Sequence, residues 1–502
     1  KNDGTLPLSG GENLLVVGEM FEKMRYQGAG SSLVQPKSVV SPKEAFDRRG
    51  VSCRYAKGYR SFDPRRDPAL EAAALEAARE ADLVLFFGGL TDFEESEGFD
   101  REHMRLAENQ TALLQALLDA GKKVALVLFA GAPVELPFFD GLSALLLMGL
   151  PGMRGGEAAA ALLLGEASPS GKLAESWPLR PEDTSCYADY NRGPVSLYYE
   201  SVYVGYRAYD KAGTRQRFPF GYGLSYTEFK YADMEVGKQN GRILVSAEIA
   251  NVGRRRGAEV VQLYVRLKDS ALFRPDKELR AFAKVELAPG ESKRVELSFR
   301  LQDLSVWHPG LGRWAVENGR YELLLAASAA DVRLSAELLV TEGEPLENPY
   351  SAEVSAAYAL PPRHIPSCFA ELAGRPPAET APRDAPLTLE SPLAAFRRSF
   401  AGRLFYAAVM RPIRKDYRKA LEMPDSPERD NRLKNIYFLL RMMPNNSLRV
   451  MCMSSGGKFT YQAAAGIVEL ARGRWLRGIA LLLKKEKPLP LPKESTVEED
   501  RT

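Results

Sequence analysis

The chain has 502 residues, 26% of them charged, and a formal net charge of +3. This length accommodates two to four domains with separate cores. The nearly neutral charge gives no indication of a nucleic-acid partner, and no stretch of about 20 apolar residues predicts a membrane span.

The four cysteines and three histidines are scattered along the chain. They form no CxxC motif and no metal-ligand spacing, so we expect no metal site, no cofactor and no Ser-His-Asp triad. Isolated cysteines are typical of free thiols in a reducing compartment, which favours the cytoplasm. The first residue is Lys1 rather than Met, so a signal peptide can neither be identified nor excluded and the localisation stays open.

Residues 1 to about 180 alternate short apolar runs with helical patterns, within a domain predicted to span residues 1–230. The predicted strands are 14–17, 83–87, 124–129 and 144–148, and the predicted helices are 68–81, 110–120 and 157–164. Asp67 is placed as the N-cap of the first of these helices, with Pro68 at its first position. The alternation predicts an α/β sandwich domain with a mainly parallel sheet.

Acidic residues crowd the stretch Thr91-Asp-Phe-Glu-Glu-Ser-Glu-Gly-Phe-Asp-Arg101, which follows a predicted strand. The carboxyl end of a buried parallel strand is where α/β sheets bind ligands. A carboxylate that is partly desolvated among like charges has a raised pKa and can donate a proton. Gly98 allows a close backbone approach, and Arg101 can orient a neighbouring acid. The alternative is an acidic, solvated surface loop.

A glycine-rich stretch, Arg25-Tyr-Gln-Gly-Ala-Gly-Ser-Ser32, follows the first predicted strand. Position 33 is Leu, so the GxGxxG dinucleotide fingerprint is absent, and there is no P-loop either. The turn can present Ser31 and backbone N–H groups to a polar ligand. A plain turn is the alternative.

Seven short motifs follow one another over the first 226 residues. They are Lys1-Asn-Asp-Gly-Thr-Leu-Pro-Leu8, Gly28-Ala-Gly-Ser-Ser32, Glu97-Gly-Phe-Asp-Arg101, Gly149-Leu-Pro-Gly152, Ser168-Pro-Ser-Gly-Lys172, Tyr203-Val-Gly-Tyr-Arg207 and Phe220-Gly-Tyr-Gly-Leu-Ser-Tyr226. Together they resemble the C-terminal half of family 3 glycoside hydrolases, the β-glucosidase/β-xylosidase family. The resemblance implies a domain that supplies a general acid/base glutamate to an active site centred on a separate (β/α)8 barrel.

The resemblance also assigns site residues. The family motif places the acid/base glutamate directly before Gly-(Phe/Tyr)-Asp-Arg, which here is Glu97. Ser31 matches the serine by which the family's glycine-rich loop touches the sugar. The residues expected to support the loop are Gly98, Asp100 and Arg101, and the alternative candidates for the acid are Glu94 and Glu95.

A retaining glycosidase needs two carboxylates about 5–5.5 Å apart. In the family the nucleophile is a barrel aspartate, usually before Trp, and no tryptophan of this chain follows Asp. A barrel takes about 250 residues, for which the chain has no room. We therefore predict a β-glucosidase-like retaining exo-glycosidase acting on a β-glycoside or oligosaccharide, with its barrel upstream or in another chain. This chain alone is expected to be inactive. The alternative is a non-catalytic carbohydrate- or partner-binding module.

Residues 231–342 change to alternating strands separated by turns. The pattern predicts about seven strands, among them 243–250, 259–267, 279–287, 293–299, 319–325 and 332–340, and hence a β-sandwich. It resembles the fibronectin type III-like module of many family members. We expect Trp307 and Trp314 to pack in its core, with carbohydrate binding as the alternative.

The last part of the chain differs in composition. Residues 343–390 are rich in Pro, Ala, Glu and Arg, which predicts a linker without the apolar density to pack a core. Residues 391–487 show helical spacing beside many Lys and Arg, with helices predicted at 393–410, 431–442 and 461–483. A small helical bundle is favoured over a basic helix on a membrane surface. Residues 488–502 are expected to be a disordered tail.

Overall fold

The computed structural model describes residues 1–190, 195–376, 385–424 and 426–484, so the predicted disordered tail lies outside the described residues. The chain divides into two compact units. The first comprises Lys1–Glu95 and Arg101–Thr380, and the second comprises Ala381–Thr502 together with the short segment Ser96–Asp100.

The first unit opens with a five-stranded sheet in which every neighbouring pair of strands is parallel. The strand order is β2-β1-β3-β4-β5. The strands are β1 (Leu14–Val17), β2 (Arg54–Ala56), β3 (Leu83–Gly89), β4 (Val124–Phe129) and β5 (Ala144–Leu147). The predicted parallel α/β sheet is thereby confirmed.

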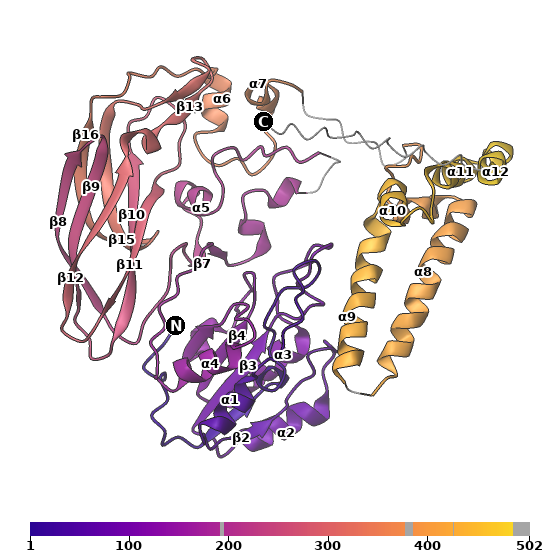
Figure 1. Cartoon of the computed structure of the whole chain (residues 1–502), viewed down its shortest axis with the longest axis horizontal. Helices are drawn as coiled ribbons and strands as arrows, with labels where there is room; N and C mark the ends of the chain where they lie inside the picture. The colour runs from indigo at the N-terminus through magenta and orange to yellow at the C-terminus, as the bar shows by residue number, and fades with distance from the viewer. Residues whose placement is uncertain (191–194, 377–384, 425, 485–502) are drawn as a thin grey trace, which may run out of the picture. The chain divides into compact units, whose positions relative to one another are not determined.

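Helices cover both faces of this sheet. Successive residues of a buried strand point to opposite sides of the sheet, so each strand contributes side chains to two cores. The helices are α1 (Pro42–Arg48), α2 (Pro68–Ala78), α3 (Glu108–Asp119) and α4 (Gly155–Leu163). In β3, Val84 and Phe86 join the core cluster that contains residues of α2 and α3. Leu85 and Phe87 join the cluster that contains residues of α1 and α4. The sheet is therefore sandwiched between two helical layers (Figure 1).

Capping residues in the sequence predict the start of one helix, but the sequence pattern does not predict the shortest elements. The side chain of Asp67 accepts hydrogen bonds from the backbone of Ala69 and Leu70, and Pro68 stands at the first position of α2, as predicted. Helix α1 has seven residues and β2 has three. Neither was predicted, since such short elements carry too few residues to show a period.

A β-sandwich follows, as predicted. Its strands are β8 (Phe229–Gln239), β9 (Arg242–Asn251), β10 (Gly257–Leu267), β11 (Glu278–Leu287), β12 (Ser292–Arg300), β15 (Gly319–Ser328) and β16 (Asp331–Val340). One sheet has the order β11-β10-β15-β16 and the other has the order β12-β9-β8. Alternate residues of both sheets, such as Val245 and Leu323, form one core cluster.

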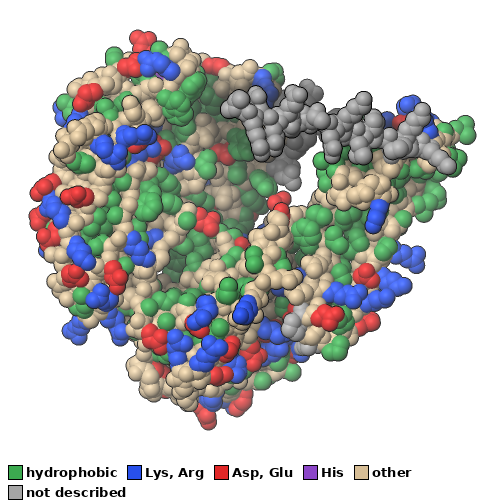
Figure 2. All heavy atoms as spheres, viewed as in Figure 1, with side chains coloured by type: hydrophobic (Ala, Val, Ile, Leu, Met, Phe, Trp, Pro, Cys, Tyr) green, Lys and Arg blue, Asp and Glu red, His purple; other side chains and the backbone are tan. Residues whose placement is uncertain are grey.

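A separate hairpin, β13 (Val306–His308) with β14 (Arg313–Ala315), carries two of the tryptophans. The prediction that they pack in the core is wrong. Trp307 is 50% exposed and Trp314 is 64% exposed, because a two-stranded ribbon outside both sheets has no second layer to cover it. On the face that Figure 2 shows, basic and acidic side chains are interspersed over the α/β domain and the sandwich.

Five further elements lie in the first unit. They are β6 (Trp177–Pro178), α5 (Tyr206–Ala212), β7 (Gln216–Phe218) and, within the predicted linker, α6 (Ala352–Ala357) and α7 (Phe369–Ala373) as a pair of short helices. The prediction that residues 343–390 cannot pack needs correcting for this part. Val354 and Tyr358 are fully buried, and the Tyr203 hydroxyl donates a hydrogen bond to the Tyr358 carbonyl over 2.6 Å. A few large side chains are enough to pack this segment, although its average composition predicted no packed core.

The second unit is helical. Its helices are α8 (Phe400–Leu421), α9 (Pro427–Met442), α10 (Leu448–Ser454), α11 (Tyr461–Ala471) and α12 (Trp475–Leu483). The stretch predicted as a helix at 393–410 is instead a 3-10 segment followed by α8, because the side chain of Ser399 accepts a hydrogen bond from the Gly402 backbone and starts a new helix. Gly473 separates α11 from α12, as its position predicted. Among the described residues, no helix has the length and apolar character of a membrane span.

Candidate active site

The acidic stretch after β3 is fixed at its beginning by Arg25, which follows β1. The guanidinium donates hydrogen bonds to the Glu95 carboxylate over 2.5 Å, to the Glu95 carbonyl over 2.8 Å and to the Leu90 carbonyl over 3.4 Å. Its Nε also lies 3.5 Å from an Asp92 carboxylate oxygen, and the Arg25 side chain is only 6% exposed. A buried guanidinium is stable only when it is paired in this way, so the first half of the loop is held to the sheet.

The two alternative acids take part in the structure of the loop. The Glu94 carboxylate accepts hydrogen bonds from the backbone N–H and the hydroxyl of Thr91, the first over 2.6 Å. The Glu95 carboxylate, besides its pairing with Arg25, accepts the Gly131 N–H over 3.1 Å. A Cβ at Gly131 would lie 2.5 Å from the Glu95 Oε1 atom, so a side chain at this position would displace the Glu95 carboxylate.

The other end of the loop is fixed by Arg101. Its guanidinium donates a hydrogen bond to the Pro133 carbonyl over 2.7 Å, which ties the loop to the segment after β4. Burial lowers the pKa of Arg101, and the charges of Glu95 and Glu94 act in the opposite direction. The interaction of Arg101 with these acids is therefore electrostatic, while its hydrogen bond goes to the backbone.

The tip of the loop, Ser96–Asp100, groups with the second unit. Glu97 and Asp100 are exposed. Gly98 has φ +88°, a left-handed conformation that other residues adopt only with strain. Within this unit, the Phe99 ring meets Tyr437 of α9 edge to face, with the ring centroids 6.0 Å apart.

The proposed sugar-binding residue, Ser31, is exposed in the turn after β1, where the Leu33 N–H donates a hydrogen bond to the Gly30 carbonyl over 3.1 Å. Ser31 belongs to the first unit and Glu97 to the second. The prediction that both lie on one rim of the sheet stays a prediction.

A further carboxylate comes from outside the loop. Glu175 lines a cavity of about 290 Å³ together with Gly131 and Leu147, at the carboxyl ends of β4 and β5. Burial raises the pKa of Glu175, and the charge of Glu95 raises it further. Sequence reasoning did not single out Glu175 or the role of Arg25, since only the topology of the sheet brings these distant segments together.

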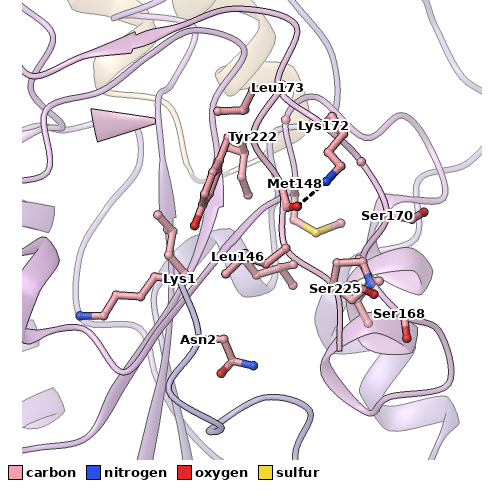
Figure 3. Close-up of a pocket in the computed structure, with 18 of the residues that line it drawn as sticks. Lys1, Asn2, Leu146, Met148, Ser168, Ser170, Lys172, Leu173, Tyr222 and Ser225 are labelled. Atoms are coloured by element: carbon pink, nitrogen blue, oxygen red, sulfur yellow. Dashed lines mark hydrogen bonds between the residues drawn. The ribbon is translucent and has the colours of Figure 1, made fainter. Parts of the chain in front are cut away.

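A larger cavity of about 530 Å³ in the first unit adjoins the cavity beside Glu175, since Leu147, Gly149, Leu173 and Trp177 line both (Figure 3). Leu146, Met148 and Tyr222 contribute apolar walls, and no carboxylate lines it within the described chain. Lys172 donates a hydrogen bond to the Gly223 carbonyl and forms an ion pair with Glu259, each over 2.8 Å. The sequence motifs at 168–172 and 220–226 meet here, and through Lys172 they join the α/β domain to β10. The cavity lacks the acids that glycosidic cleavage requires.

No cluster of metal-binding side chains occurs among the described residues.

The combination of an α/β sandwich, an acidic loop at a strand end and a fibronectin-like sandwich identifies the class of protein. Residues 1–226 match the glycosyl hydrolase family 3 C-terminal domain, and residues 259–329 match the fibronectin type III-like domain. The chain thus carries the C-terminal portion of a family 3 glycoside hydrolase.

Particular relatives bear this out. The chain is 38% identical over 346 residues to the thermostable β-glucosidase B of Acetivibrio thermocellus, an alignment that covers 67% of this chain and 46% of that protein. It is 34% identical over 384 residues to an exo-α-(1→6)-L-arabinopyranosidase of Bifidobacterium breve, covering 71% of this chain and 51% of the relative. The crystal structure of a Bifidobacterium adolescentis GH3 β-glucosidase superposes with a TM-score of 0.64 at 33% identity, covering 74% of this chain and 55% of that one. The chain spans about half the length of the curated relatives it matches.

Proposed function

We propose that this chain is the acid/base-supplying part of a β-glucosidase-like retaining exo-glycosidase that hydrolyses O-glycosyl bonds. Glu97 is the general acid/base, Ser31 contacts the sugar, and Gly98, Asp100 and Arg101 support the loop. The aspartate nucleophile comes from a (β/α)8 barrel, encoded upstream or in another chain. The names of the relatives include both a β-glucosidase and an arabinopyranosidase, so the glycoside is left unspecified.

One observation carries the choice of Glu97. The carboxylate of Glu94 accepts a hydrogen bond from Thr91 and that of Glu95 accepts one from Gly131, and both residues are half-buried, whereas Glu97 stands exposed on the tip, directly before Gly98. An acid that protonates a leaving group must be able to reach the substrate. The half-buried carboxylates of Glu94 and Glu95 are less accessible to a substrate than the exposed Glu97.

The proposed chemistry has two steps. In the first, the barrel aspartate attacks the anomeric carbon while Glu97 protonates the departing oxygen. In the second, the carboxylate of Glu97 takes a proton from water as that water displaces the enzyme from the sugar. Because the chain contributes only one of the two carboxylates, we propose that it is inactive by itself. Turnover of an aryl β-glucoside by the purified 502-residue chain would contradict this.

The acid/base assignment is tested in the enzyme that includes the barrel. Glu97→Ala should slow substrates with poor leaving groups by orders of magnitude and affect activated aryl glycosides much less in the first step. With activated substrates the second step should then limit the rate, and azide, which needs no general base, should restore turnover and yield a β-glycosyl azide.

Glu94→Ala serves as the matched control, since Glu94 only shapes the loop in this proposal. It should lose rate evenly across leaving groups and gain nothing from azide. If Glu94→Ala or Glu95→Ala shows the azide rescue and Glu97→Ala does not, the acid is misassigned. If none of the three changes turnover, the alternative of a non-catalytic binding module is favoured.

A further inference from the structure

The β13–β14 hairpin presents two tryptophans to solvent. Trp307 and Trp314 stand directly opposite each other across the hairpin, with 50% and 64% of their surfaces exposed. Leu311, at the tip of the hairpin, is also exposed. Large apolar side chains that gather on an otherwise mixed surface mark a binding site more often than single exposed ones do.

The two indole rings form a corner. Their centroids are 6.0 Å apart and their planes cross at 73°. One ring can therefore lie against the face of a small ring-shaped ligand while the other contacts its edge. A flat, extended surface would meet the face of one of these rings only.

The corner is held in place before any ligand arrives. The Leu311 N–H donates to the Nδ1 atom of the buried His308, so the His308 proton is on Nε2, which faces the Glu347 carbonyl at 2.8 Å. Arg313, next to Trp314, donates two hydrogen bonds to the Glu344 carboxylate, over 2.7 and 2.6 Å. A site that is already ordered loses less conformational entropy on binding.

The size of the apolar surface argues against a protein partner. Two half-exposed tryptophans and one leucine expose roughly 300 Å², given that an aromatic side chain presents about 150–250 Å² in full. A stable protein interface buries about 800 Å² on each side. The corner thus fits a small ligand or one unit of a chain.

A pyranose ring matches these features. Its C–H face is apolar and polarised positively, which suits the negative face of an indole. We propose that the β13–β14 hairpin is an accessory binding site for a pyranose unit of a soluble β-glucan or gluco-oligosaccharide, distinct from the acid loop. The choice of β-linked glucose rests on the proposed function.

Binding is measured with the 502-residue chain, using cellohexaose in tryptophan-fluorescence titrations and a soluble mixed-linkage β-glucan in affinity gel electrophoresis. The wild-type chain should be retarded by the glucan. Trp307→Ala and Trp314→Ala should each raise the Kd at least about tenfold, and the double variant should migrate as in a gel without glucan. Phe282→Ala is the matched control, since Phe282 is 67% exposed on β11 of the same sandwich. It should bind like the wild type.

Several results would overturn the proposal. One is that the wild-type chain binds neither glycan, and another is that Phe282→Ala loses as much affinity as the tryptophan variants. A third is tighter binding of the wild-type chain to crystalline cellulose than to the soluble glucan. A fourth is that the wild-type chain is a dimer and Trp314→Ala converts it to a monomer. Should an alanine variant fail to fold, Trp307→Phe and Trp314→Phe keep a ring, and a weakening of intermediate size is expected. Binding requires no turnover, so this result is independent of the test of Glu97.

Discussion

Replacing Arg25 tests whether the base of the acid loop is held as the contacts indicate. Arg25→Met keeps the length of the side chain but removes the charge that faces Glu95 and Asp92. The side chains of Arg25 and Glu95 are 6% and 21% exposed, so the pair is mostly buried. Removing one partner of a buried pair costs about 3–5 kcal/mol, and the partial exposure of Glu95 places the expected loss at the lower end, about 3 kcal/mol.

For a domain of this size each kcal/mol lowers the midpoint by roughly 2–4 °C, so calorimetry should show a fall of roughly 6–12 °C in the α/β transition. Arg49→Met is the control, because Arg49 pairs with Glu166 at the surface, where such pairs contribute up to about 1 kcal/mol. Hydrogen exchange of residues 91–95 should accelerate in Arg25→Met alone.

A double-mutant cycle with Glu95→Gln isolates the pair. We expect a coupling energy of about 1–3 kcal/mol, since the two side chains share a hydrogen-bonded ion pair. The reasoning is refuted if the two substitutions are additive within about 0.5 kcal/mol, or if Arg25→Met lowers the midpoint no more than Arg49→Met does.

Two further predictions concern stability. The folded chain raises the pKa of Glu175 above its ordinary value of 4.5, so the folded state binds this proton more tightly, and the ionised group destabilises the fold as the pH rises from about 4.5 through the raised pKa. Glu175→Gln should therefore raise the unfolding midpoint at pH 7 and leave it unchanged well below pH 4.5, and an equal gain at both would contradict the sign. Tyr358→Ala should cost about 3–5 kcal/mol in urea unfolding because it empties a fully buried aromatic site, whereas Leu360→Ala, at an exposed position, should cost less than about 0.5 kcal/mol. Equal effects of the two would show that this segment does not pack.

The sequence predicted what periodicity and capping encode locally. The buried strands β1 and β4 occur at the predicted residues because an unbroken apolar run fits a strand covered on both faces. Periodicity says nothing about which layer lies over a side chain. Tryptophans were therefore assigned to a core that does not cover them, and Tyr358 was assigned to a linker although distant segments bury it.

The candidate site likewise contains residues that a local sequence pattern predicts and contacts that only the fold brings together. The assignment of Glu97 depended on a motif in the sequence, and its place before a glycine with φ +88° is a local feature. The hydrogen bonds of Arg25 to Glu95, and the charge of Glu95 near Glu175, join segments separated by 70 and 80 residues. No local pattern encodes such contacts, since they follow from the order in which the sheet brings its strand ends together.

These anchors bear on how one domain can supply an acid to a nucleophile held by another. A catalytic carboxylate must be placed to within about 0.5 Å, which a free loop does not achieve. The acidic stretch has eleven residues, Thr91 to Arg101, but Arg25 binds it up to Glu95 and Arg101 ties its end to Pro133. Only the five residues of the tip, Ser96–Asp100, lie between the two anchors. A short span has fewer conformations to lose when the acid is positioned, so in the proposed mechanism the pairing of the neighbouring acids helps to place Glu97 by restricting its backbone. In the proposed enzyme that includes a barrel, Arg25→Met should therefore reproduce part of the leaving-group dependence of Glu97→Ala, although Arg25 itself touches no reacting atom in this mechanism.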